Sequence, residues 1–104
     1  MSYFKALKLT NTFTGVGIGA LASITTGATN NTGVGFNAGT SLTTGDFCTL
    51  MGDTAGDAIT TGSRISAFGY SAGGSISTNS DLSAFGYRAL ESTTGIGNTG
   101  LGVD

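Results

Sequence analysis

Few residues in this chain of 104 residues are of a type that could do chemistry. Histidine is absent, so the chain cannot form a Ser–His or Cys–His nucleophile pair. Cys48 is the only cysteine, which excludes an intrachain disulfide and leaves a zinc site short of soft ligands. The carboxylates follow no calcium-loop spacing, and they stand at Asp46, Asp53, Asp57, Asp81, Glu91 and Asp104. We therefore expect no enzyme activity, no metal site and no cofactor.

One glycine motif could suggest a dinucleotide site. The segment Gly33–Ala38 reads Gly-Val-Gly-Phe-Asn-Ala and fits the pattern G-x-G-x-x-A. That pattern binds a pyrophosphate only between a strand and a helix. It recurs at Gly15–Ala20, and no helix is predicted after either copy. A repeated structural unit explains both copies, and cofactor binding does not.

The repeat itself is visible in the pentapeptide Ser-Ala-Phe-Gly-Tyr, which occurs at residues 66–70 and again at 83–87. We number each repeat from its central glycine, called position 0. These glycines recur at intervals of about 17 residues, a period that indicates a stacked solenoid. The central-glycine column consists of Gly17, Gly35, Gly52, Gly69, Gly86 and Gly102.

Three further positions of the repeat keep their chemical character. The apolar column at position −1 consists of Val16, Val34, Met51, Phe68, Phe85 and Leu101. The hydroxyl column at position −3 consists of Thr14, Thr32, Thr49, Ser66, Ser83 and Thr99. The alanine column at position +3, for which we predict a tight turn, consists of Ala20, Ala38, Ala55, Ala72 and Ala89. Residues 13–104 thus form five repeats of about 17 residues and the start of a sixth, preceded by a non-repeat segment at 1–12.

The spacing around each central glycine predicts an all-β fold. In Ile65–Tyr70 the two faces alternate, with Ser66, Phe68 and Tyr70 on one and Ile65 on the other, as in a strand. A second strand is predicted near Ser41–Thr44 and its equivalents, so each coil has two short strands and two turns. Coils then stack as a parallel β-roll with strands about 4.8 Å apart. We expect the thin interior to hold only small residues.

Large side chains on the outer face of the strands cannot enter such an interior. They form an exposed apolar stripe, and stripes of this kind mark association sites. Closed symmetry lets several copies bury the same stripe against one another. We therefore expect an obligate homo-oligomer whose core is the apolar column.

The segments NTGVGFNAGTSLTTG, ISAFGYSAGG, LSAFGYRALESTTG and NTGLGVD resemble the Gly-Ala-rich repeats of viral and phage tail-fibre shafts. They are also similar to the head repeats of trimeric autotransporter adhesins. The resemblance covers about nine-tenths of the chain. It implies a homotrimer of left-handed parallel β-rolls with the apolar column packed around the three-fold axis. The period is longer than is usual in adhesin heads, and a signal peptide, stalk and anchor are lacking, which favours the fibre.

The resulting expectation is a non-enzymatic structural module of a virion tail fibre. Its partners would be two further copies, another fibre or baseplate protein, and a host-surface glycan or protein. Alternatives are an adhesin head on a cell surface, a self-assembling extracellular filament, and an ice-binding solenoid that uses the hydroxyl column. A net charge of −2 without a basic patch argues against nucleic acid, and no apolar run is long enough for a membrane span.

The two ends of the repeat array and its variable loops are the remaining candidate contact regions. The segment 1–12 offers Tyr3, Phe4, Leu7 and Leu9 for burial, so we expect it to cap the first coil or dock onto another protein. The last coil shows no atypical capping unit, so we expect the stack to continue there, within a longer chain or onto a neighbour. Loops that differ between repeats, such as Ala28–Asn30 and Ser63–Arg64, are candidate contact points.

Overall fold

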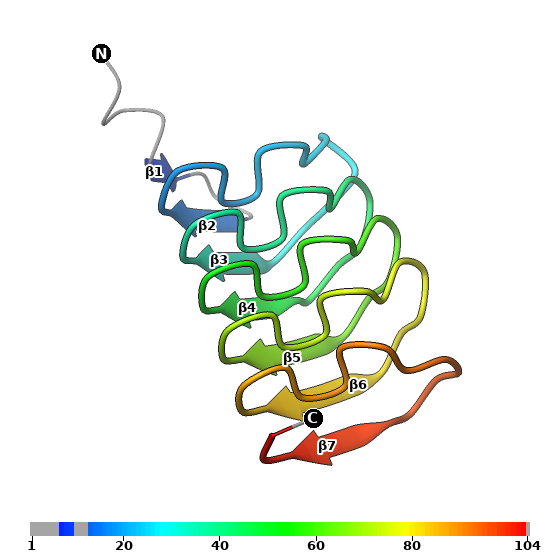
Figure 1. The fold of residues 1–104 in the computed structure, drawn as a ribbon. Helices are drawn as coiled ribbons and strands as arrows, with labels where there is room; N and C mark the ends of the chain where they lie inside the picture. Colours follow the sequence, from blue (N-terminus) through cyan, green and yellow to red (C-terminus); the bar gives the residue numbers. More distant parts are fainter. Residues whose placement is uncertain (1–6, 10–12, 104) are drawn as a thin grey trace.

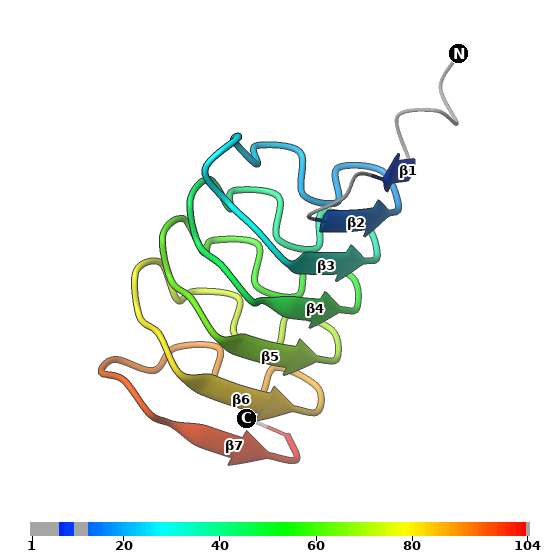
Figure 2. The same cartoon turned by 180° about the vertical axis from the view of Figure 1, so that it is seen from behind.

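The computed structural model describes residues 7–9 and 13–103, and in these residues the chain is an all-β solenoid without a helix. Figure 1 shows coils stacked one below another, with one strand per coil along one side, and Figure 2 shows the same stack from behind. The strands form a single sheet in chain order. They are β1 (Leu7–Leu9), β2 (Phe13–Val16), β3 (Asn31–Val34), β4 (Thr49–Met51), β5 (Ile65–Phe68), β6 (Leu82–Phe85) and β7 (Thr99–Leu101).

The strand register confirms the predicted repeat. Strands β2 to β7 pair in parallel, each with the next. Ser66 lies opposite Ser83 and Phe68 opposite Phe85, so the two copies of the pentapeptide are neighbours in the sheet. The columns read from the sequence are therefore ladders that run along the solenoid. The trimer and the left-handed coil stay predictions.

The prediction of a second strand in each coil is wrong. Three turns follow one another there, with the N–H of Ala38, Thr40 and Leu42 donating to the carbonyl three residues earlier. Asn37 and Gly39 have φ of 54° and 60°, which curls the backbone away from an extended path. Coils are still joined on this side, because the Thr43 N–H donates to the Thr60 carbonyl at 2.9 Å.

The interior is also larger than predicted. Leucine and isoleucine side chains from the turns and strands fill it, including Leu21, Leu42, Leu50, Ile59, Ile65, Ile76 and Leu82. Small residues make room for large ones in the same coil and in the neighbouring coil. A Cβ on Gly39 would lie 2.7 Å from Leu50 Cδ1, and one on Gly56 would lie 2.9 Å from Leu50 Cδ2. The side chains at positions −2 and +4 thus share one space in the interior, and a small residue at one position allows a large residue at the other.

The central-glycine column has a purely geometric cause. Each of the first five members has φ between 122° and 134°, a region that residues with a side chain rarely adopt. A Cβ on Gly52 would lie 2.5 Å from the Gly69 carbonyl oxygen in the next coil. Glycine is therefore required wherever the strand ends and the chain turns back close to its neighbour.

The N-terminal edge of the sheet is paired by β1. This strand runs antiparallel to β2, with Leu7 opposite Val16 and Leu9 opposite Thr14. It thereby supplies backbone partners to a strand that would otherwise be an open edge. Leu7 and Leu9 of the predicted docking set lie in β1, whereas Tyr3 and Phe4 lie outside the described residues.

Candidate interaction surfaces

The apolar column lies on the outer face of the sheet, at or next to the end of each strand. Its side chains stay accessible in the single chain: Val16, Met51 and Phe85 are about 40% exposed, Leu101 is 78% exposed, and Val34 and Phe68 are partly buried. The rings of Phe68 and Phe85 stack with centroids 5.0 Å apart. The structure therefore brings the predicted core residues together in one continuous ladder that nothing in the described chain covers.

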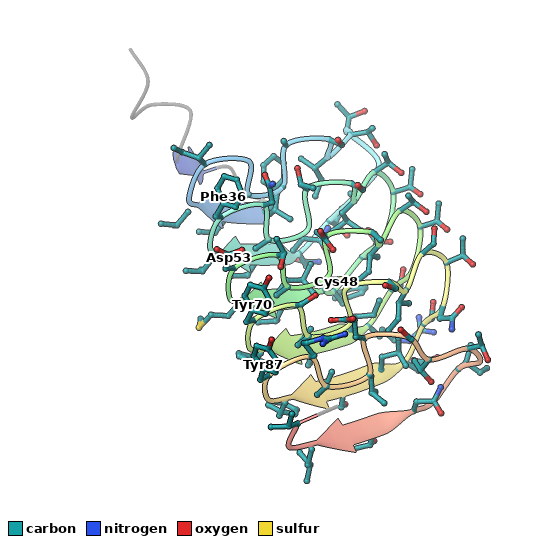
Figure 3. The ribbon with its side chains drawn as sticks, in the orientation of Figure 1. Phe36, Cys48, Asp53, Tyr70 and Tyr87 are labelled. Carbon is teal, nitrogen blue, oxygen red and sulfur yellow. The ribbon has the colours of Figure 1, made fainter. Side chains whose placement is uncertain are left out.

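A second exposed ladder lies on the other side of the central glycines, at position +1. Its members are Ile18, Phe36, Asp53, Tyr70, Tyr87 and Val103. Figure 3 shows Phe36, Asp53, Tyr70 and Tyr87 one above another along the stack. The two tyrosine rings stack at 5.3 Å, and Asp53 interrupts the apolar series. The sequence pattern drew attention to Tyr70 and Tyr87 but missed Ile18 and Phe36, although an apolar residue directly after the glycine was the available signal.

The two ring ladders have a common geometry. Interplanar angles of 6° and 12° mean that each ring covers a face of its neighbour in the stack. Each ladder contains one such stacked pair, Phe68–Phe85 in the apolar column and Tyr70–Tyr87 at position +1.

The alanine and hydroxyl columns occupy different environments. All five alanines of the alanine column are buried. The N–H of each donates to the carbonyl of the central glycine three residues earlier. The hydroxyl column lies on the outer face of the sheet, partly buried in β2 to β6 and exposed at Thr99. Thr14, Thr32 and Thr49 lie directly opposite one another in the register.

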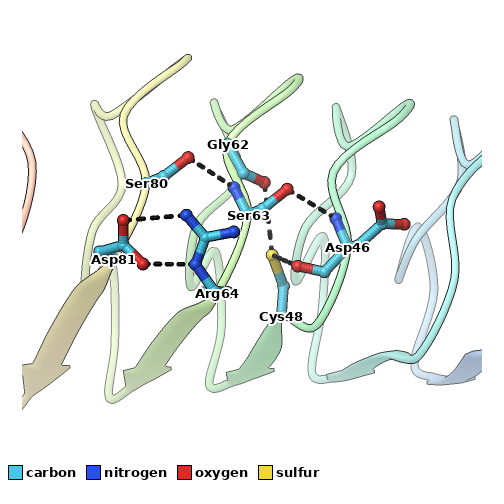
Figure 4. A network of polar contacts seen from close by, with 7 residues as sticks. All are labelled: Asp46, Cys48, Gly62, Ser63, Arg64, Ser80 and Asp81. Carbon is cyan, nitrogen blue, oxygen red and sulfur yellow. Dashed lines mark hydrogen bonds and ion pairs between the residues drawn. The ribbon is translucent and has the colours of Figure 1, made fainter.

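A polar ladder lies at the corner before the strands, at position −6. The Asp46 N–H donates to Ser63 Oγ, and the Ser63 N–H donates to Ser80 Oγ, both at 3.0 Å. The Thr29 N–H donates to Asp46 Oδ1 at 2.6 Å. Figure 4 shows this ladder from Asp46 to Ser80. Each coil thus supplies a side-chain acceptor to the backbone of the coil before it, which fixes the corner.

Beside this ladder, Arg64 and Asp81 form an exposed ion pair between coils. Arg64 Nε lies 2.5 Å from Asp81 Oδ1, and Nη2 lies 3.0 Å from Oδ2. The hydrogen bonds from Arg64 hold the pKa of the Asp81 carboxyl below its usual range. A second pair joins Arg88 to Glu91 and lowers the pKa of that carboxyl in the same way.

Cys48 is buried beneath this corner and is poorly suited to nucleophilic chemistry. Its thiol lies 3.5 Å from the Gly62 carbonyl and 3.6 Å from the Asp46 carbonyl. Burial raises the pKa of the thiol to about 11, so the thiolate is scarce at neutral pH. Asn31 occupies the same position one coil earlier, where its amide donates to the Gly45 carbonyl and accepts from the Cys48 N–H.

The remaining carboxylates form no metal centre in the part of the chain that the structure describes, since no three Cys, Asp or Glu side chains gather there. Burial raises the pKa of Asp57, with the Glu91 and Asp53 charges adding smaller effects. Within the same residues, no helix is long and apolar enough to cross a membrane.

No protein-family model, curated protein or solved structure matches the chain.

Proposed function

We propose that the chain is a non-enzymatic structural module, a homotrimeric segment of a virion tail fibre. The observation that carries the proposal is the uncovered apolar column, which runs along the described solenoid from Val16 to Leu101. A soluble protein that exposes such a stripe usually buries it against a partner. An identical copy is a suitable partner because its stripe has the same rung spacing and the same length.

A solenoid suits the work of a fibre. Each coil contacts only its neighbours, so length grows with the number of repeats while the cross-section stays constant. Here 17 residues add one rung of about 4.8 Å. Three copies with their apolar columns around one axis would give a stiff shaft whose other surfaces stay free for further contacts.

The oligomeric state is tested by light scattering combined with charge-introducing variants. We expect the unaltered chain to be trimeric at micromolar concentration, with an unfolding temperature that rises with protein concentration. Phe85→Lys places a charge within the apolar column and should give monomers. Thr61→Lys is the matched control, because Thr61 is exposed in a turn outside the column, and it should stay trimeric.

Two results would contradict the proposal. The first is a stable folded monomer of the unaltered chain at micromolar concentration. The second is equal assembly of Phe85→Lys and Thr61→Lys. Filaments seen by electron microscopy of the purified chain would instead favour the extracellular filament.

A second, weaker candidate is an ice-binding surface on the hydroxyl column. The direct register of Thr14, Thr32 and Thr49 favours it, because it spaces their hydroxyls regularly. The stacked rings of Phe68 and Phe85 on the same face disfavour it, since they interrupt a flat hydroxyl surface. Measurement of thermal hysteresis in solution tests this candidate directly.

A further inference from the structure

Position −5 combines a left-handed backbone with side chains other than glycine, as position +2 also does at Asn37, Thr54, Ser71 and Arg88. Five residues of the described part of the chain occupy it: Asn30, Phe47, Arg64, Asp81 and Gly97. All five have φ between 56° and 71°, the left-handed region that favours glycine. Asparagine and aspartate tolerate this region, but phenylalanine and arginine do so at a cost. The fold alone would be satisfied by glycine at every coil, as it is at Gly97.

Apolar packing does not explain these side chains, although Arg64 and Asp81 pair with each other across neighbouring coils. Leu21 and Leu90 at position +4 are also left-handed, but Leu21 is buried and Leu90 packs against the hydrophobic core. At position −5 the Phe47 side chain is 58% exposed, and Asn30, Arg64 and Asp81 are exposed as well. We call Asn30, Phe47, Arg64 and Asp81 the corner ridge. Strained and solvent-facing residues of this kind often serve recognition.

The backbone beneath the corner ridge is held in place. The N–H groups of Phe47, Arg64 and Asp81 each donate to a carbonyl of the preceding coil, at 3.1, 2.8 and 3.0 Å. The polar ladder at position −6 adds side-chain bonds next to it. The ridge side chains are therefore displayed from a fixed frame, which lowers the entropy lost when a ligand binds.

The Phe47 ring is exposed and differs from the stacked pairs Phe68–Phe85 and Tyr70–Tyr87. No ring of the described residues stacks on Phe47, whose neighbours along the ridge are Asn30 and Arg64. The Arg64 guanidinium is directed toward Asp81 on the next coil, as Figure 4 shows. The guanidinium is thus directed away from Phe47, and the exposed Phe47 ring can contact a ligand.

We propose that the corner ridge binds a short, uncharged saccharide segment. The negative face of an aromatic ring attracts the weakly positive C–H groups of a pyranose. The flanking amide, guanidinium and carboxylate are planar groups that pair with sugar hydroxyls as donors and acceptors. Arg64 and Asp81 neutralise each other, so the ridge offers no surplus positive charge to an acidic sugar.

The dimensions also fit a linear saccharide. Adjacent ridge residues are one rung apart, about 4.8 Å, which is close to the length of one pyranose in a chain. Asn30 to Asp81 spans three rung intervals, about 14 Å, and so matches about three sugar residues. The corner ridge lies just before the start of each strand, and the apolar column lies at the end of each strand. A four-residue strand separates the two by about 13 Å. Assembly through the apolar column therefore leaves the ridge free.

This inference deepens the fibre proposal by naming the chemistry of the surface partner. The test uses the full chain with cellotriose, maltotriose and the β-1,4-linked trimer of N-acetylglucosamine, and trigalacturonic acid as an anionic comparison. Saturation-transfer NMR detects millimolar binding and shows which protons of the sugar touch the protein. We expect at least one neutral trisaccharide to bind with its ring C–H groups against the protein, and trigalacturonic acid to bind more weakly.

The decisive variant is Phe47→Gly, which removes the ring and relieves the left-handed strain together. We expect at least tenfold weaker binding with an unfolding temperature that is unchanged or higher. Phe36→Ala is the matched control, because Phe36 is a comparably exposed phenylalanine of the ladder at position +1, and this variant should bind normally. Binding by none of the neutral trisaccharides, undiminished binding by Phe47→Gly, or a preference for trigalacturonic acid would overturn the proposal.

Light scattering on the same samples separates this inference from the fibre proposal. Trimers that bind no neutral sugar would support the fibre proposal and refute saccharide binding by the corner ridge. Monomers that bind through Phe47 would do the reverse.

Discussion

Two features require glycine at position 0: a positive φ and close contact with the next coil. Three glycine-to-alanine substitutions separate their contributions to stability. Gly27→Ala adds a methyl group at a site outside the left-handed region with nothing within 4 Å. Gly97→Ala adds it at φ +71°, again in open space. Gly52→Ala adds it at φ +134°, 2.5 Å from the Gly69 carbonyl oxygen and 2.7 Å from its carbon. Gly27→Ala thus introduces no conflict, Gly97→Ala introduces backbone strain alone, and Gly52→Ala introduces backbone strain together with steric overlap.

The expected magnitudes follow from these environments. Gly27→Ala should stabilise the protein by about 0.5 kcal/mol, because alanine restricts the unfolded chain. Gly97→Ala should destabilise it by about 1 kcal/mol, the cost of a left-handed alanine. At Gly52, strain of about 1–3 kcal/mol combines with overpacking of about 1–3 kcal/mol, which gives about 4 kcal/mol. The overlap cannot relax easily, because the Gly69 N–H is bonded to the Met51 carbonyl at 2.8 Å.

Denaturant unfolding measures the three values. All samples need the same protein concentration, since unfolding of an oligomer depends on it. The midpoint should shift while the slope with denaturant stays constant. A Gly52→Ala variant no less stable than Gly97→Ala would refute the argument that coil contact, rather than φ alone, requires glycine in this column.

Three further predictions concern the interior. Between pH 9 and about 11 the Cys48 thiol loses its proton in the unfolded chain but keeps it in the folded protein. The free energy of unfolding should therefore fall as pH rises, by up to about 3 kcal/mol. Denaturant titrations at several pH values measure this dependence, and Cys48→Ala should reduce it. Gly33→Ala should destabilise the protein by about 1–3 kcal/mol, because its Cβ would lie 2.9 Å from Leu21 Cγ; in a double-mutant cycle Leu21→Gly should reduce that penalty, and strict additivity would contradict the shared-space account. Asn31→Ala should cost about 1–3 kcal/mol, because the buried Cys48 N–H and Gly45 carbonyl lose their partner; an unchanged thermal midpoint would show that these bonds contribute nothing.

The sequence sufficed for those aspects of the fold that depend on neighbouring coils having the same residue at the same position. Ser66 opposite Ser83 and Phe68 opposite Phe85 follow directly from the 17-residue offset, because a parallel register places equal positions side by side. The requirement for glycine at position 0 was visible as a column, although its cause, the approach to the next carbonyl, was not.

Other aspects depend on contacts between unequal positions of the repeat, within one coil or between coils, which a column of identical residues cannot show. Leu50 breaks the small-residue pattern at position −2, and the sequence gives no local reason for it. Only the structure shows that Gly39 and Gly56 supply its space. The absent second strand has a similar origin, because the left-handed φ of Asn37 is imposed by the turn and is not encoded by a glycine.

The sequence predicted the apolar column but not the corner ridge, because only the apolar column repeats the same kind of residue in every coil. The apolar column keeps its character in every coil and is easily recognised. The corner ridge changes residue at each coil, so sequence reasoning found its members only as irregular loops. Its shared left-handed backbone is a property of the fold, and the contrast with Gly97 becomes visible only when φ is known.

The direction of the sheet hydrogen bonds determines how this solenoid would respond to force. The bonds between β2 and β7 run along the stack, so tension applied between its two ends loads one rung at a time and peels it, instead of shearing all strands together. Each coil of 17 residues occupies about 4.8 Å when folded and up to about 58 Å when extended. A single chain pulled end to end would therefore lengthen about twelvefold in equal steps at low force. A load applied across the stack would meet several strands acting in parallel, and the folded chain should resist it much more strongly.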